Sequence, residues 1–180
     1  MLKVCLVAIG AWLVTASAAA TVLVPADLAE LSREAGAIAR GRVAAVEGQW
    51  TADRRGVETL VTLDVDAYLK GSLGETVTFK VPGGRLGRFR NLVVGAPELA
   101  VGQRIVVFLG HRGPSIPFVL GLSQGVYRLA RTGDTWLVTP PVSAVAAAMP
   151  QRVVRGDPAR RPLALPAFER QVRAYVEAAR

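Results

Sequence analysis

The sequence predicts a mainly β protein: a small antiparallel barrel of roughly five to six strands, with a short helix before it and an amphipathic helix after it. Apolar and polar residues alternate along several segments, and turn residues separate these segments at short intervals. No alternation of strands with long helices is visible. Hydrophobic residues make up 51% of the 180 residues and charged residues 20%, which is enough apolar material for a packed core.

The first residues are typical of a secretory signal peptide. Lys3 gives a positive start, residues 4–14 form a short apolar run, and the small residues of 15–20 offer cleavage sites. We therefore expect residues 1–20 to be removed and the protein to be exported to the periplasm or the extracellular space. No stable transmembrane span should remain, because the apolar run is shorter than the roughly 20 residues that a bilayer requires. An uncleaved anchor is the alternative.

Cysteine and charge narrow the possible functions. Cys5 is the only cysteine and lies in the predicted signal, so the exported chain should have no disulfide, no thiolate metal site and no cysteine nucleophile. The formal net charge is +8. This excess favours an anionic partner, or it reflects a general preference for arginine in the composition.

The N-terminal half predicts one helix and three strands. Residues 25–35 suit a short helix, because a proline can occupy its first turn and two leucines form an apolar stripe. Residues 37–50 change to a period of two, with Gly41 as a bulge or a close backbone approach. Residues 57–69 alternate most clearly, and residues 75–81 return as the partner strand of a hairpin.

On the strand at 57–69, alternation assigns each side chain to one of two faces. The apolar face is expected to include Leu69, and the polar face Asp64, Asp66 and Tyr68.

The C-terminal half predicts a buried strand, a second hairpin and a helix. The continuous apolar run at 104–109 should lie in the middle of the sheet. Residues 119–125 should lead into a strand at 126–130, which pairs with residues 135–138 across a tight turn. An irregular glycine-rich connection fills residues 82–97. The helix at the C-terminal end has one apolar stripe, which includes Phe168, Val172 and Val176.

These observations divide the chain into segments. We expect a signal peptide at 1–20, a barrel domain at 21–139, a Pro/Arg-rich linker or wrapping segment at 140–166, and the C-terminal helix at 167–180.

The segment Gly121–Gly125 (GLSQG) fits the G-x-S-x-G pattern of a serine-hydrolase nucleophile elbow. Such an elbow leads directly into a helix, and its base is a histidine late in the chain. Here a strand and a hairpin are expected after Ser123, and the only histidine, His111, precedes it. We therefore interpret the two glycines as a close backbone approach or a bulge rather than as part of a catalytic site.

The candidate binding residues lie in the glycine-rich connection and near the histidine. Arg85, Arg88 and Arg90 flank Phe89, and no acidic residue occurs between Glu75 and Glu98. Such a group can hold an anion or stack on a planar group. The alternative is a solvated basic loop.

The loop around His111 is the second candidate contact. No pattern indicates a cofactor or a metal site, and we expect neither. Asp64 and Asp66 lie two residues apart on the polar face of one strand and could bind a cation through their oxygens, but a solvated or arginine-paired edge is the preferred interpretation.

Five segments between residues 36 and 130 carry a resemblance: IARGRVAAVEGQW, VETLVTLDVDAYLKG, VTFKVPGG, GAPELAVGQRIVVFL and GLSQGVYRL. They resemble a family of uncharacterised exported bacterial β-barrel proteins, and the strand pattern is similar to barrels of the OB or netrin type. Tissue inhibitors of metalloproteinases have such a barrel. The resemblance implies a closed or partly closed five-stranded barrel. The inhibitors act through an N-terminal cysteine and disulfides, which the exported chain lacks.

The sequence therefore favours a non-catalytic, exported binding or interaction module. Its partner would be another exported protein or an anionic surface polymer. One alternative is an inhibitor or accessory protein of a secreted peptidase, and another is a serine hydrolase that uses Ser123. Binding of nucleic acid or acidic polysaccharide is a further alternative, and it predicts a steep salt dependence.

Overall fold

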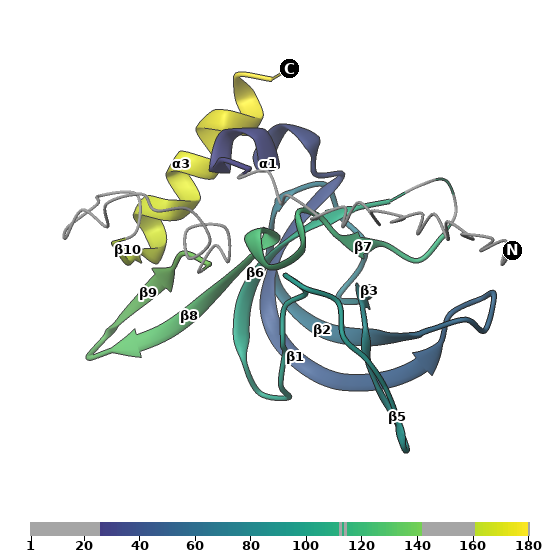
Figure 1. Ribbon diagram of the computed structural model, residues 1–180. Coiled ribbons are helices and arrows are strands. Elements are labelled where there is room, and N and C mark those ends of the chain that lie inside the picture. Colours follow the sequence, from purple (N-terminus) through teal and green to yellow (C-terminus); the bar gives the residue numbers. More distant parts are fainter. Residues whose placement is uncertain (1–25, 112, 114, 142–160, 180) are drawn as a thin grey trace, which may run out of the picture.

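The computed structural model describes residues 26–111, 113, 115–141 and 161–179 (Figure 1). The predicted signal peptide and most of the predicted Pro/Arg-rich segment lie outside these residues. In the part described, no helix is long and apolar enough to cross a membrane. The elements are α1 (Leu28–Glu34), β1 (Ala37–Trp50), β2 (Val57–Lys70), β3 (Thr76–Pro82), β4 (Gly84–Leu86), β5 (Phe89–Asn91), β6 (Arg104–Gly110), β7 (Phe118–Val119), the 3-10 helix η1 (Leu122–Gly125), β8 (Val126–Thr132), β9 (Thr135–Thr139), β10 (Leu163–Ala164) and α3 (Leu165–Glu177).

Five of these strands close into a barrel, which confirms the predicted fold class. β1 pairs with β2, β2 with β3, β3 with β7, β7 with β6, and β6 returns to β1. The pairing of β3 with β7, between Lys80 and Phe118, is parallel, and the others are antiparallel. A closed ring with an odd number of strands cannot alternate direction all the way round. One parallel contact is therefore required, and the barrel is mixed rather than fully antiparallel.

The other three strands of this sheet, β8, β9 and β10, extend it away from the barrel. β8 pairs with β6 on the same edge as β7, and β9 and β10 follow in order. In Figure 1 the β8–β9 hairpin projects from the barrel beneath α3. The outer face of β6 and this extension provide the surface on which the helices pack.

The barrel interior is one apolar cluster. β6 contributes side chains to both sides of the barrel wall: Ile105 and Val107 point inward, whereas Val106 and Phe108 belong to the outer cluster. This confirms the prediction of a central buried strand. The buried residues of the interior are Ala37, Ala39, Val43, Val61, Leu63, Val77, Phe79, Val81, Ile105, Val107, Leu109, Val119 and Val126.

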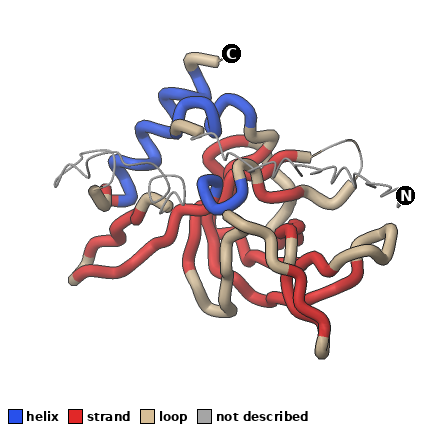
Figure 2. The backbone as a smooth tube through the Cα atoms, viewed as in Figure 1, coloured by secondary structure: helices blue, strands red, loops and turns tan. Residues whose placement is uncertain are grey.

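A second apolar cluster joins the outer face of the barrel to both helices. In Figure 2 α1 and α3 lie together on one side of the strands. The apolar stripe of α3 is buried there through Phe168, Val172 and Val176, which places the C-terminal helix on this domain. Arg40 of β1 also donates to the carboxylate of Glu169 on α3, at 2.5 Å. The helix is therefore an integral part of the fold.

Alternation along β2 fails near its end. Arg40 of β1 pairs with Ala67, but the next residue, Gly41, pairs with Val65, so that Asp66 is an extra residue in β2 ahead of Tyr68 and Leu69. As a consequence Leu69 joins the outer cluster, and Tyr68 packs against the barrel core. The expected faces of these two residues were wrong, because a bulge shifts the period by one position.

Tyr127 connects the sheet to α3 and should titrate abnormally. Its ring lies 5.6 Å from that of Phe108 and 4.9 Å from that of Phe168. Burial, with the charge of Asp27 as a second cause, raises the pKa of Tyr127 from 10.0 to about 12. The folded protein therefore holds this proton more tightly than the unfolded chain does. The resulting stability is complete below pH 10 and is lost as the pH rises towards 12.

The Tyr127→Phe variant tests this assignment. Between neutral pH and about pH 12, the wild-type protein should lose about 2–3 kcal/mol of unfolding free energy relative to the variant. Denaturant titration of both proteins at several pH values measures the difference. If the unfolding free energies of the two proteins change in parallel with pH, Tyr127 has no raised pKa.

Candidate functional site

The connection that contains the candidate arginines is partly a β-hairpin. β4 and β5 pair in register, and a two-residue turn joins them at Gly87 and Arg88. Gly87 has a φ of 56°, which a first central residue of a tight hairpin turn requires. We expected an irregular loop, because strands of three residues are too short to show a period. The available signal was a single glycine between two short apolar and basic segments.

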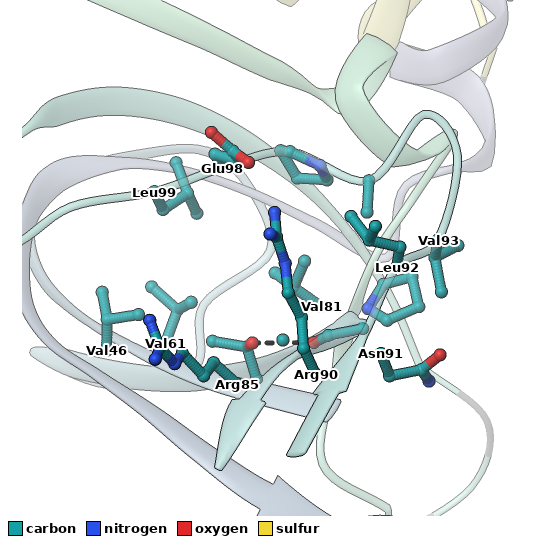
Figure 3. Close-up of a pocket in the computed structure, with 16 residues that line it drawn as sticks. Val46, Val61, Val81, Arg85, Arg90, Asn91, Leu92, Val93, Glu98 and Leu99 are labelled. Carbon is teal, nitrogen blue, oxygen red and sulfur yellow. Dashed lines mark hydrogen bonds between the residues drawn. The ribbon is translucent and has the colours of Figure 1, made fainter. Parts of the chain in front are cut away.

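The base of the hairpin is held against the barrel by close backbone contacts. A Cβ atom on Gly48 of β1 would lie 2.0 Å from the carbonyl oxygen of Arg85, and one on Gly84 would lie 2.2 Å from Oγ1 of Thr59. The Thr59 hydroxyl donates to the carbonyl oxygen of Gly83 at 2.8 Å, which is the dashed line in Figure 3. The position of the hairpin is therefore fixed by strands β1 and β2.

A pocket of about 490 Å³ opens between the hairpin, the barrel and residues 92–99 (Figure 3). Its volume lies within the range of small-molecule sites. Its floor consists of apolar side chains from the barrel and from the segment that follows the hairpin: Val46, Val61, Val81, Ala96 and Leu99. Its rim includes Arg85, Arg90 and Glu98.

Two arginines at this rim are cross-strand neighbours. Arg85 and Arg90 are directly paired across β4 and β5, and both side chains are exposed. Like charges at opposite positions of a strand pair are destabilising. Among the described residues, no carboxylate forms an ion pair with either arginine. In Figure 3 Arg90 rises toward Glu98, whereas Arg85 extends on the side of Val46. The pair therefore leaves positive charge directly at the pocket opening.

The turn of the hairpin forms a separate surface outside the pocket. The Arg88 guanidinium lies 5.2 Å from the centre of the Phe89 ring, and that ring meets Trp50 edge-on at 5.0 Å. Phe89 is 46% exposed, and neither Arg88 nor Phe89 lines the pocket. The four residues predicted from the connection thus divide into a rim pair and a tip pair.

His111 does not belong to this site. It is exposed, and its ring lies against Gly36, immediately before β1. The hairpin contacts Gly48, near the other end of β1. The structure therefore separates the two predicted contact surfaces, and two residues of the arginine cluster, Arg85 and Arg90, line a pocket.

The GLSQG segment has a structural role. A Cβ atom on Gly125 would lie 1.9 Å from the carbonyl oxygen of Leu120, in agreement with the expected close backbone approach. The backbone N–H of Ser123 donates to the carbonyl oxygen of Gly95 at 2.8 Å, and Gln124 accepts from the backbone of Ala26. Strand β8 follows directly. The segment ties the connection that lines the pocket to the barrel.

The predicted carboxylate pair is divided between different surroundings. Asp66 forms an ion pair with Arg104 at 2.6 Å, and Asp64 is exposed. Within the described ranges, no group of three or more histidine, cysteine, aspartate or glutamate side chains is placed to hold a metal ion.

The site as a whole can hold an anion at its rim beside an apolar group on its floor. Sequence reasoning identified Arg85 and Arg90, but it missed Glu98 and the floor residues, which meet only after the barrel closes. Neither a protein family model nor a curated protein matches the chain.

Proposed function

We propose that the protein is a non-catalytic binding module of the cell envelope or extracellular space, which holds an anionic partner at the β4–β5 hairpin and its pocket. One observation carries this proposal. Arg85 and Arg90 stand opposite each other at the pocket opening, without a carboxylate to form an ion pair among the residues described. Such an arrangement costs stability in the free protein, and an anionic group would offset that cost.

The chemistry of the rim favours recognition over catalysis. Guanidinium groups stay protonated at physiological pH and bind carboxylate or phosphate groups through paired hydrogen bonds. They hold an anion well but do not exchange protons readily. The proposal of export rests on the sequence of residues 1–20.

A second candidate is inhibition of a secreted peptidase. The hairpin protrudes from the barrel in Figure 1, and its tip carries the exposed ring of Phe89. A protruding hairpin of this kind suits insertion into a cleft. If this candidate is correct, a peptidase should be captured through Phe89, and its activity should fall on binding.

A capture experiment with two arginine triples tests the first proposal. The chain from Thr21 onward is used to capture partners from the secreted and envelope fractions, at low and moderate salt. The Arg85/Arg88/Arg90→Ala variant should lose the partner. The Arg131/Arg170/Arg173→Ala variant removes the same charge from exposed positions elsewhere and should retain it. Equal loss in both variants, or no capture by the wild-type protein, would contradict the proposal.

A further inference from the structure

The pocket lining has an apolar part and a charged part. Its apolar floor continues from the barrel core, because Val46, Ala96 and Leu99 pack against the interior cluster while remaining partly accessible. Its opening carries the guanidinium groups of Arg85 and Arg90. A ligand that contacts both the apolar floor and the arginines must combine an aliphatic body with an anionic head.

The charge at the rim indicates the charge of that head. Glu98 lines the same opening, and its side chain is exposed. Two arginines and one glutamate leave a single net positive charge, which matches one carboxylate better than a doubly charged phosphate. The planar guanidinium groups also suit the two oxygens of a carboxylate.

From these observations we propose that the pocket binds a single-chain aliphatic carboxylate, with its chain on the Val46 and Leu99 floor and its head between Arg85 and Arg90. This inference rests on the proposed function and names its ligand class. The hairpin tip takes no part, because Arg88 and Phe89 do not line the pocket.

Calorimetric titration with three probes tests the head group and the aliphatic chain of the ligand separately. Dodecanoate, kept at concentrations at which it remains monomeric, should bind the wild-type protein. Dodecanol has the same chain without the charge and should bind at least about tenfold more weakly, because it loses the charge-assisted hydrogen bonds. Butanoate has the same head with a short chain and should also bind at least about tenfold more weakly, because less apolar surface is buried.

Three variants assign the head group to the rim. The Arg85→Gln/Arg90→Gln double variant should abolish the preference for dodecanoate over dodecanol. The Glu98→Gln variant should bind dodecanoate a few-fold more tightly, because it removes the repelling carboxylate. The Arg131→Gln variant removes a charge from an exposed position of β8 outside the pocket, and it should bind as the wild-type protein does.

The outcomes distinguish this inference from the proposed function. Equal affinity for dodecanoate and dodecanol, or a preference that survives the double variant, would overturn the carboxylate site. If dodecanoate does not bind but capture from the envelope fraction still depends on the hairpin arginines, the inference fails and the proposed function stands. If neither dodecanoate binding nor capture depends on the hairpin arginines, both the inference and the proposed function fail.

Discussion

Replacement of Phe168 by alanine should lower the free energy of unfolding by about 3–5 kcal/mol. The side chain is 1% exposed and lies in the cluster between α3 and the barrel wall, with its ring 4.9 Å from that of Tyr127. Truncation would leave a cavity that the packed neighbours cannot fill. Urea denaturation of the wild-type protein and the variant measures the loss.

The Arg170→Ala variant is the control for this prediction. Arg170 lies on the same helix with an exposed side chain, so its loss should change stability by no more than about 0.5 kcal/mol. A loss of less than about 1 kcal/mol for Phe168→Ala would mean that α3 does not pack on the barrel in solution, since even modest core truncations cost that much.

The free energy of unfolding should fall by about 3 kcal/mol in the Gly41→Ala variant, because the barrel wall has no room for a side chain at this position. A Cβ atom at this position would lie 2.0 Å from the carbonyl oxygen of Asp64 on β2. The register of the two strands also shifts next to Gly41, so it is a point at which β1 bends around the barrel. To relieve the clash, the two strands would have to separate. Denaturant midpoints of the purified variants provide the measurement.

A second glycine on the same segment serves as the control. In the Gly36→Ala variant the nearest neighbour of the new Cβ atom would be the side chain of His111, at 3.1 Å. The carbonyl oxygen of Leu109 would lie at 3.7 Å, which is an ordinary contact distance. Because the His111 ring is exposed and can rotate away, the loss should stay below about 1 kcal/mol. Equal losses of stability in both variants would show that β1 and β2 do not approach each other closely at Gly41.

The sequence allowed the main elements of the barrel to be predicted because they are long alternating segments or continuous apolar runs. β1 and β6 were expected at nearly their observed bounds, since their patterns extend over many residues. The short hairpin of β4 and β5 was missed, because three residues cannot establish a period. The faces of Tyr68 and Leu69 were wrong because a bulge leaves no trace in composition.

The candidate site could be predicted only in part. Arg85 and Arg90 were recognisable from a basic, glycine-rich segment without acidic residues. The pocket beside them was not, because Val46, Val81 and Leu99 are far apart in the chain and meet only through the closure of the barrel. The loop around His111 is the second candidate contact from the sequence, and it lies at the other end of β1 from the hairpin.

Amide chemical-shift mapping during titration with dodecanoate tests the central claim most directly. We expect the largest shifts at residues that line the pocket, in the hairpin base and the segment up to Leu99, and no shift at Gly36 or His111. The Arg85→Gln/Arg90→Gln variant should show much smaller shifts at the same residues. Shifts centred on Gly36 and His111, or the same shifts in the variant and the wild-type protein, would contradict an anion site at the pocket beside the β4–β5 hairpin.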